Sequence, residues 1–376
     1  MRIAMMGTRG VPASYSGFET FVEELGTRLA ARGHTVTVYN RSTWIAHREP
    51  TYRGMRLKRL PTIPHKYFDT VAHTLLSTLH GLLGRYDVVL ICNLANAPFA
   101  LIPRLAGQRV ALNVDGVERK RKKWNRLGQL YLFAAEWIAT RTPNVMVTDA
   151  AVMERYYAER YGVKSAMIPY GAPVGREPAP EIVRGLGLEP DRYVLYVARL
   201  EPENNVHVVI EAFEGVETDL TLAVVGDAPY AREYIARLKS TTDSRIRFLG
   251  FVFGDGYRAL QQSAYAYVQA TEVGGTHPAL LEAMGYGNYV IANGTPENRE
   301  VLGDAGVSYD GVAGLRDALQ TVLDDPARRA PFQERAMARI RASYGWDAIT
   351  DQYEALFQKM TVKRGSRSSC PTQKGV

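Results

Sequence analysis

The chain has 376 residues, 46% of them apolar, and a formal net charge of +7. This length suffices for two domains with separate cores. Two cysteines cannot build a disulfide framework, and no apolar run reaches the 18 residues of a membrane-spanning helix, so we expect neither a disulfide-rich secreted protein nor an integral membrane protein.

Positive charge is concentrated in the first half of the chain. Residues 1–173 contain 24 Lys and Arg against 12 Asp and Glu, whereas residues 174–376 contain 22 against 27. A basic half favours an anionic partner, such as a membrane surface, a nucleic acid or a pyrophosphate-bearing substrate. Ordinary surface charge that keeps the protein soluble is the alternative.

Short apolar runs alternate with amphipathic helical patterns along the whole chain. In the first half the pattern predicts a helix at 19–33 and strands at 2–7, 35–40, 87–93, 109–116 and 144–149. In the second half it predicts helices at 205–214, 229–240, 256–263 and 278–286 and strands at 193–200, 220–227, 246–251, 264–270 and 288–294. This alternation is typical of parallel βαβ units, so we expect an α/β protein with two doubly wound, Rossmann-like domains facing a cleft.

The domain limits follow from composition. Residues 169–182 are rich in Pro and Gly, which predicts a hinge between an N-terminal domain at 1–173 and a C-terminal domain at 174–345. Apolar residues at helical spacing predict a closing helix at 346–361. The remaining residues, 362–376, are polar and without periodicity, so we expect a disordered tail.

Three motifs occur in a fixed order, GTRGVP…YSGFETFVEEL, VARLEPENN and VGGTHPALLEAM. Together they resemble the family 4 glycosyltransferases with the GT-B fold, over roughly residues 1–355. The chain looks most like the bacterial subgroup whose N-terminal domain opens with G-T-R-G-[IV]-P and which includes polysaccharide rhamnosyltransferases. In that fold the C-terminal helix packs back toward the N-terminal domain.

The resemblance also implies an activity. It predicts a retaining transferase that moves a hexose or deoxyhexose, with L-rhamnose from dTDP-β-L-rhamnose as the best guess, to a lipid-linked or glycan acceptor in bacterial surface polysaccharide synthesis. The leaving diphosphate itself would accept the acceptor's proton, so no protein nucleophile is required. The nucleotide sugar is a substrate, and we expect no cofactor and no catalytic metal, because the sequence has no Cys/His cluster and no D-x-D motif.

The motif VGGTHPALLEAM predicts the main part of the donor site. Gly274, Gly275 and Thr276 precede a helix that starts at Pro278, and unpaired amides at a helix N-terminus bind anions such as a diphosphate. Glu282 matches the carboxylate that the family uses for the nucleotide ribose, although a surface charge on the helix is the alternative.

Two further positions in this stretch are less regular. The family commonly has a first carboxylate eight positions before the ribose-binding one, where this chain has Gly274, and the nearest acid, Glu272, is two residues off. His277 is placed to donate to the donor phosphate or sugar, and a purely structural histidine is equally compatible with the pattern.

Arg199 follows the strand predicted at 193–200, so it emerges at the carboxyl edge that faces the cleft. A guanidinium binds phosphate in a bidentate way and stays charged, which makes Arg199 the best candidate for stabilising the leaving diphosphate. Pairing with Glu201 or Glu203 on the surface is the alternative. Asn204 stands where the family usually has a lysine, so one positive charge at the diphosphate is missing or supplied elsewhere.

The loop GTRGVPASYSGFET lies between the first strand and the first helix. It does not match G-x-G-x-x-G, which disfavours a dehydrogenase. In the family this loop lies beneath the donor phosphates and borders the acceptor pocket, which makes Gly10 a donor-site candidate. The acceptor-site candidates are Arg9, Tyr15, Phe18 and Glu19.

The stretch NVDGVERKRKKWNR follows another predicted strand. Asp115 and Glu118 are placed at the strand end to bind a sugar hydroxyl or to orient the acceptor. Next comes a basic run beside an aromatic residue, which suggests a patch for anionic lipid and hence a cytoplasmic protein on the inner face of the cell membrane. The patch comprises Arg119, Lys120, Arg121, Lys122, Lys123 and Trp124. A solvated basic loop is the alternative.

Two other classes of function remain open at this point. A sugar-nucleotide epimerase shares the two-domain fold and would bind the same donor. A nucleic-acid-binding protein would explain the basic half, but not an arginine, a Gly-rich helix start and a ribose-type carboxylate in one cleft. We therefore expect a nucleotide sugar, a lipid-linked glycan acceptor and an anionic membrane surface as partners, and no nucleic acid.

Overall fold

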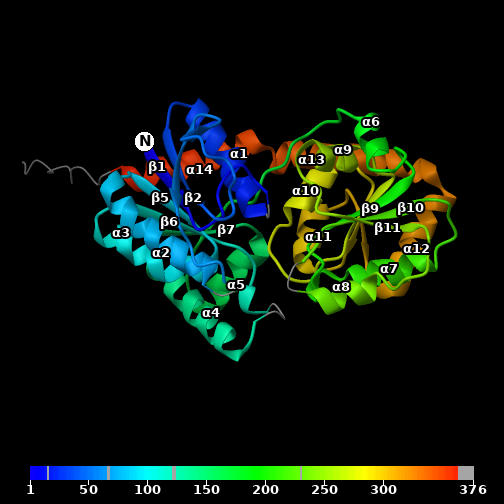
Figure 1. Ribbon diagram of the computed structural model, residues 1–376, viewed down its shortest axis with the longest axis horizontal. Coiled ribbons are helices and arrows are strands. Elements are labelled where there is room, and N and C mark those ends of the chain that lie inside the picture. Colours follow the sequence, from blue (N-terminus) through cyan, green and yellow to red (C-terminus); the bar gives the residue numbers. More distant parts are fainter. Residues whose placement is uncertain (15–16, 66–67, 121–123, 229–230, 363–376) are drawn as a thin grey trace, which may run out of the picture.

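The fold consists of two parallel sheets, each covered by helices on both faces (Figure 1). The structure, a computed structural model, describes residues 1–14, 17–65, 68–120, 124–228 and 231–362. Within these residues the first sheet has eight strands in the order β3-β4-β2-β1-β5-β6-β7-β8, and the second has six in the order β11-β10-β9-β12-β13-β14. All pairings are parallel except the β3–β4 hairpin.

The elements of the N-terminal half occupy residues 2–167. Its strands are β1 (Arg2–Met6), β2 (Thr35–Arg41), β3 (Thr51–Tyr52), β4 (Met55–Leu60), β5 (Val88–Cys92), β6 (Arg109–Val114), β7 (Val145–Thr148) and β8 (Ala166–Met167). Its helices are α1 (Gly17–Ala31), α2 (Asp69–Gly81), α3 (Leu101–Leu105), α4 (Arg126–Ala139) and α5 (Ala151–Tyr161), with 3-10 turns η1 (Leu82–Gly84), η2 (Leu94–Ala100) and η3 (Glu118–Lys120).

The elements of the C-terminal half begin at residue 180. Its strands are β9 (Tyr193–Val197), β10 (Thr221–Val225), β11 (Ile246–Gly250), β12 (Ala266–Gln269), β13 (Val290–Asn293) and β14 (Val307–Tyr309). Its helices are α6 (Pro180–Gly185), α7 (Val206–Glu214), α8 (Arg232–Leu238), α9 (Gly254–Ser263), α10 (Pro278–Gly285), α11 (Pro296–Leu302), α12 (Gly311–Asp324), α13 (Arg329–Ser343) and α14 (Trp346–Thr361), with 3-10 turns η4 (Pro202–Asn204) and η5 (Pro326–Arg328).

Burial explains why the sequence forms these layers. The central strands β1, β5, β6 and β9 are buried along nearly their whole length, as expected for parallel strands covered on both faces. The ten strands predicted from the sequence are all present, within a few residues. The edge strands β3, β8 and β14 escaped prediction because they are only two or three residues long, and β4 because its alternating charges, MRLKRL, resemble a surface segment.

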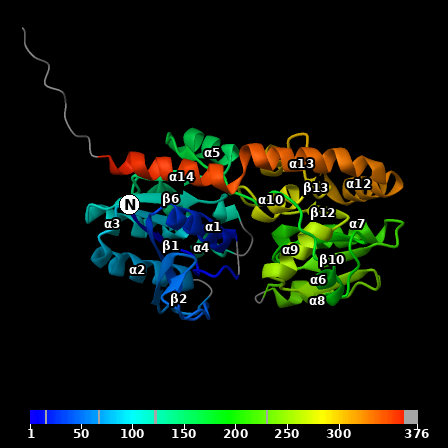
Figure 2. The same ribbon diagram turned by 90° about the horizontal axis from the view of Figure 1, so that it is seen from above.

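The C-terminal helix α14 returns to the N-terminal half, which confirms the GT-B arrangement (Figure 2). It packs against α1, where Arg32 forms an ion pair of 2.6 Å with Asp351 and His34 Nε2 lies 2.7 Å from Glu354. Inside, Asn113 Nδ2 donates a hydrogen bond of 2.8 Å to the hydroxyl of Tyr353.

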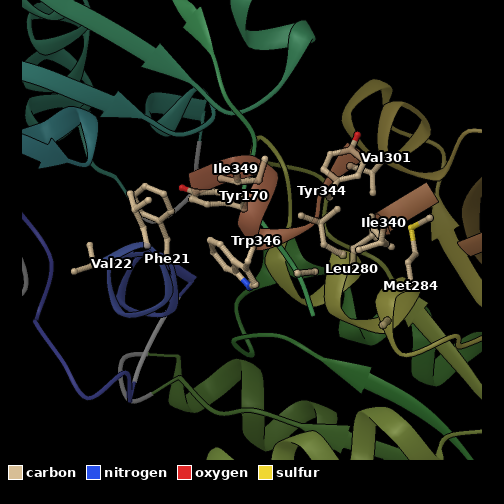
Figure 3. Close-up of a cluster of buried hydrophobic side chains, with 14 of the residues drawn as sticks. Phe21, Val22, Tyr170, Leu280, Met284, Val301, Ile340, Tyr344, Trp346 and Ile349 are labelled. Atoms are coloured by element: carbon tan, nitrogen blue, oxygen red, sulfur yellow. The ribbon is translucent and has the colours of Figure 1, made fainter. Parts of the chain in front are cut away.

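The two halves share a continuous apolar core at the place where the chain crosses between them (Figure 3). Trp346, at the start of α14, lies between Phe21 of α1 and Leu280 of α10. Within the predicted hinge, Ala172 N donates to Tyr344 O at 2.8 Å, so the two crossings of the chain run side by side. This core ties the halves together on one side of the molecule and leaves the other side open. The boundary at residue 173 stays a prediction, and the predicted tail falls almost entirely outside the described residues.

Candidate functional site: the cleft between the two sheets

A cleft of about 2020 Å³ separates the two halves, and residues from both halves line it. The carboxyl ends of the strands face it, as expected for doubly wound sheets. Arg9, Phe18 and Glu118 line the N-terminal wall, and Arg199 and Glu282 line the C-terminal wall. The structure therefore brings together candidates that lie in four separate motifs of the sequence.

Arg199 lies two residues beyond the end of β9, on the wall of the cleft. Its side chain is 25% exposed, and its Nη1 is 3.5 Å from Glu201 Oε2. Both interpretations of Arg199 are thus partly realised, because the guanidinium faces the cleft and also has a carboxylate neighbour. The ion pair is long and both side chains are partly open to water. An incoming diphosphate can therefore compete with Glu201 for the guanidinium of Arg199.

Glu282 lies on α10, with its carboxylate at the back of the cleft. Since α10 begins at Pro278, as predicted, Glu282 is little more than one turn into the helix. The hydroxyl of Tyr257 donates a hydrogen bond to Glu282 Oε2, and Gln261 Nε2 donates to the same hydroxyl at 3.0 Å. Burial raises the pKa of Glu282 to about 7, which the hydrogen bond from Tyr257 partly counteracts and the charge of Glu24 reinforces.

The glycine-rich turn before α10 differs from the prediction. Gly275 N donates to Asp115 Oδ1 at 3.3 Å, and Thr276 N donates to Asp149 Oδ2 at 2.8 Å. Both acceptors are carboxylates of the N-terminal half. The expectation that these two amides hold a diphosphate is therefore wrong for this arrangement of the halves, because each amide already has an acidic partner.

Close packing explains why this turn carries glycine. A Cβ on Gly275 would lie 2.2 Å from Asp149 Oδ2, and a Cβ on Gly116 would lie 2.3 Å from the carbonyl carbon of Gly274. At Gly274 itself a Cβ would lie 2.5 Å from the ring of His277, which is the N-cap residue of α10 and lines the cleft. The carboxylate that the family resemblance predicts at this position would therefore require the His277 ring to move.

Three donor-site candidates do not line the cleft: Gly275, which faces Asp149, and Glu272 and Gly10. Glu272 is exposed, and its backbone amide donates to Glu203 O at 3.0 Å. Gly10 is buried with a φ of 115°, where it lies against Asn40; a Cβ there would be 2.2 Å from the Asn40 side chain. Asn40 in turn accepts from Val11 N at 3.1 Å. Gly10 thus allows the loop to pack closely against Asn40 and does not line the cleft.

The loop after β1 supplies part of the N-terminal wall. Arg9 N donates to Glu19 Oε1 at 2.8 Å, so the buried Glu19 fixes the loop to the start of α1. The guanidinium of Arg9 lies over the ring of Trp44, 4.4 Å from its centre, and both line the cleft. Phe18 lines it as well, packed edge-on against Tyr170. Tyr15, the remaining acceptor-site candidate, lies outside the described residues.

The stretch after Asp115 only partly resembles a membrane patch. Arg119 Nε is 3.0 Å from Glu136 Oε1, and its Nη2 donates to the hydroxyl of Tyr156 at 3.1 Å. This charge is therefore used to neutralise a fully buried carboxylate. Trp124 is half-buried and lines the cleft together with Glu118. Arg121, Lys122 and Lys123, and the side chain of Lys120, lie outside the described part of the chain.

Three groups of polar residues were not predicted from the sequence. Asp149 follows β7 as Asp115 follows β6, and this strand-end position was the available signal. Tyr257, the partner of Glu282, carries no signal in sequence. Arg41 and Asp69 form a buried ion pair of 2.8 Å on the N-terminal wall, beside Trp44.

The described residues contain neither a metal-binding cluster nor a helix that could span a membrane. In this part of the chain no group of three or more His, Cys, Asp or Glu side chains is arranged to hold a metal ion. Over the same residues, none of the helices combines the length and the apolar character needed to cross a membrane.

Two family models match the chain, and each covers one of its halves. The Glycosyl transferase 4-like domain matches residues 16–171, and Glycosyl transferases group 1 matches residues 191–325. Glycogen synthase of Mycobacterium tuberculosis (strain ATCC 25618 / H37Rv) is 26% identical over 424 aligned positions, which cover 99% of this chain and 97% of the relative. O-antigen chain mannosyltransferase B of Escherichia coli is 26% identical over 168 positions, 43% of this chain and 44% of the relative.

Solved structures share the same arrangement. The sucrose-phosphate synthase from Thermosynechococcus elongatus superposes with a TM-score of 0.80 at 21% identity, over 96% of this chain and 99% of its own. Anabaena Alr3699/HepE in complex with UDP-glucose superposes with a TM-score of 0.78 at 16% identity, over 96% and 100%. At such low identities the likeness shows the fold alone. From the two domain matches and this fold we conclude that the chain belongs to the glycosyltransferases, with the GT-B arrangement of two Rossmann-like domains.

Proposed function

We propose that this protein is a retaining glycosyltransferase that moves a hexose or deoxyhexose from a nucleotide diphosphate to a lipid-linked or glycan acceptor in bacterial surface polysaccharide synthesis. The observation that carries the proposal is that Arg199 and Glu282 lie on the same wall of one cleft. This cleft is large enough for a nucleotide sugar and an acceptor together. Arg199 suits the diphosphate, and Glu282 suits the ribose diol, since a carboxylate accepts two hydrogen bonds.

The chemistry needs orientation and charge stabilisation rather than a protein nucleophile. The acceptor oxygen bonds to the anomeric carbon as the bond from that carbon to the diphosphate oxygen breaks, and the acceptor's proton passes to the leaving diphosphate. Arg199 stabilises the negative charge that develops there. Asp115 and Glu118, on the opposite wall, orient the sugar or the acceptor.

We propose dTDP-β-L-rhamnose as the donor, on the basis of the GTRGVP opening. Relatives with surface-polysaccharide names support the acceptor class: O-antigen chain mannosyltransferase B of Escherichia coli, and lipopolysaccharide core biosynthesis glycosyltransferase LpsD of Rhizobium meliloti, which is 29% identical over half of this chain. In addition, the complex of Anabaena Alr3699/HepE with UDP-glucose is an example of this fold binding a nucleotide sugar.

Exposed apolar side chains support a membrane-bound acceptor. Large apolar residues that are at least 37% exposed occur on α2, α3, α4 and the turn η1. The helices α2, α3 and α4, labelled in Figure 1, all contact η2, and η1 contacts α2. The exposed apolar residues are Leu75, Leu76, Leu79, Leu82, Leu83, Leu101, Leu105, Leu127, Leu130, Phe133 and Trp137, which we call the apolar face. Exposed arginines on or beside the same elements, Arg85, Arg104, Arg126 and Arg141, complement anionic lipid. This face would hold the protein at the cytoplasmic leaflet as a peripheral protein.

A panel of nucleotide sugars tests the proposal, first by thermal shift and then by transfer. Donors that bind the folded state raise the melting temperature by mass action, so the panel ranks them directly. With the best donor, labelled sugar should leave the nucleotide only when a polyprenyl-diphosphate glycan is added. Interconversion of the sugar without acceptor would favour an epimerase instead, and salt-dependent binding of random oligonucleotides would favour a nucleic-acid-binding protein.

A further inference from the structure

Two carboxyl groups of the N-terminal half meet the glycine-rich turn of the C-terminal half. Asp115 follows β6 and Asp149 follows β7, and these strands are neighbours in the sheet, so both side chains emerge at the same edge. Asp115 Oδ1 accepts hydrogen bonds from Gly116 N at 2.8 Å and from Gly275 N at 3.3 Å. Asp115 lines the cleft, whereas Asp149 is fully buried behind it.

Asp149 is bonded to Thr276 through two separate groups. Its Oδ2 accepts from Thr276 N at 2.8 Å, and its backbone carbonyl accepts from the Thr276 hydroxyl at 2.6 Å. Its other carboxyl oxygen, Oδ1, is buried and accepts no hydrogen bond from any described residue. Asp115 is the neighbouring carboxylate, since the adjacent donors Gly275 N and Thr276 N of one turn bond to Asp115 and Asp149 respectively. A proton on Oδ1 that forms a hydrogen bond to Asp115 would satisfy this oxygen.

The surroundings favour the neutral form of Asp149. Burial, followed by the neighbouring charge of Asp115, raises the pKa of Asp149 well above its usual range. The phenols of Tyr157, Tyr170 and Tyr353 also interact electrostatically with the pair, and burial raises their own pKa values, so they are neutral too.

We propose that Asp149 is a neutral carboxylic acid that keeps its proton and donates a hydrogen bond to Asp115. Asp149 is then the positioning residue that fixes the Asp115 carboxylate at the cleft and holds the 274–276 turn beside it. The negative charge of the pair then remains on Asp115, the member that faces the substrate. Two carboxyl groups so close cannot both be ionised cheaply, and sharing one proton also aligns them. The part of the proposal that concerns catalysis rests on the proposed function.

The experiment compares Asp149→Asn with Asp149→Leu. In Asp149→Asn the amide oxygen can accept from Thr276 N while the amide nitrogen donates to Asp115, so the hydrogen-bonding pattern of the neutral acid is reproduced. Leucine has a similar size but offers neither bond. We expect Asp149→Asn to keep kcat/KM for transfer within about three-fold of the parent, and Asp149→Leu to lose about ten-fold or more, mainly in kcat, because Asp115 loses its support.

Stability as a function of pH tests the proton itself and needs no substrate. An acid whose pKa is raised on folding is stabilised at low pH, and this stabilisation is lost as pH rises from the unfolded value near 4 through the folded one. The amide introduced by Asp149→Asn cannot titrate, so the melting temperature of this variant relative to the parent should rise between pH 5 and pH 8. Asp87→Asn, which removes an exposed carboxylate that accepts from Arg2 N at 2.7 Å, is the matched control for the substitution.

The two measurements separate the ways in which the proposal can fail. A melting temperature of Asp149→Asn that falls relative to the parent as pH rises would show that Asp149 is ionised in the folded protein, and the proposal would be overturned. Loss of transfer in Asp149→Asn as severe as in Asp149→Leu would equally overturn it, since a carboxylate would then be required. If the parent transfers no sugar, the proposed function fails, while the pH dependence of stability still decides the state of Asp149.

Discussion

The side-chain amide of Asn204 donates a hydrogen bond of 2.6 Å to the backbone carbonyl of Arg199. Asn204 is only 5% exposed, and its backbone carbonyl accepts a hydrogen bond of 2.6 Å from the hydroxyl of Tyr196. The residue that replaces the family's lysine is thus used inside the loop, where it holds Arg199 at the end of β9. The sequence alone left open whether Asn204 donates to the diphosphate, and the structure shows that one of its two amide hydrogens is used within the loop.

Asn204→Lys should therefore lower donor affinity, although sequence comparison alone suggests that a lysine here is harmless or favourable. The ammonium group cannot reproduce the short amide contact inside the turn, and a lost hydrogen bond to a buried carbonyl destabilises by about 1–3 kcal/mol. The donor KM and the melting temperature are the measurements. Equal or higher activity in Asn204→Lys would show that the turn adapts and that the extra charge is what matters.

Arg199→Ala should lose at least about 2 kcal/mol of transition-state stabilisation, roughly a thirty-fold drop in kcat/KM, because the charge nearest the leaving diphosphate is removed. Arg192→Ala is the control: Arg192 precedes the same strand at its other end, where it pairs with Asp219 on the surface. A fully active Arg199→Ala enzyme would leave the phosphate role to another residue.

The raised pKa of Glu282 predicts that nucleotide binding depends on pH. Burial raises its pKa to about 7, so at pH 6 the carboxyl is mostly protonated and accepts poorly from the ribose hydroxyls. Affinity for the nucleoside diphosphate should rise between pH 6 and pH 8, measured by isothermal titration. In Glu282→Gln the affinity should be weaker by about 1–3 kcal/mol at pH 8, and it should lack the part of the increase between pH 6 and pH 8 that comes from Glu282. Titration of the ligand's own phosphate affects both proteins equally, so an identical pH profile in the two would contradict the assignment.

Glu136 should be essential for the stability of the N-terminal half. It is fully buried and accepts from Arg119 as well as from the hydroxyls of Tyr156 and Tyr161, at 2.9 and 2.8 Å. Glu136→Ala should lower stability by about 3 kcal/mol in denaturant melts, because three donors lose their acceptor. Glu181→Ala removes one partner of an exposed ion pair with Arg184 and should change stability by less than about 0.5 kcal/mol. Similar losses in both variants would mean that Arg119 is not committed to Glu136.

The apolar face and the basic run at 119–123 predict different salt dependences of membrane binding. Replacing Leu79, Leu83, Leu130 and Trp137 by Ser should weaken liposome binding at both low and high salt, because each exposed apolar side chain contributes through burial. Replacing Lys120, Arg121, Lys122 and Lys123 by Gln, with Arg119 kept because it pairs with the buried Glu136, should weaken liposome binding only at low salt, since charge attraction is screened.

Co-sedimentation with anionic and with neutral vesicles measures both effects. Ile182→Ser, a substitution at an exposed apolar residue of the C-terminal half, is the control that should leave binding unchanged. Turnover on a lipid-linked acceptor should fall with binding, whereas turnover on a short water-soluble analogue should not. A parent protein that binds neither kind of vesicle would remove the membrane from the proposal.

The sequence by itself determined the two parallel sheets, their central strands and the position of the cleft. Hydrophobic periodicity is a local property, and the rule that ligands bind at the carboxyl ends of parallel strands turns a list of strands into a list of strand-end residues. Arg199, Glu282 and Asp115 were found in this way or from the motifs beside those strand ends, and all three line the cleft.

Only the tertiary structure decided which partner each polar group has. Thr276 N is bonded to a carboxyl group 127 residues away and Gly275 N to one 160 residues away, while Arg119 is paired with Glu136 on another helix. None of these pairings leaves a periodic trace, because each depends on where two separate elements meet. The sequence therefore showed which residues stand at the cleft, and the packing of the two halves showed which of them are committed to contacts within the protein.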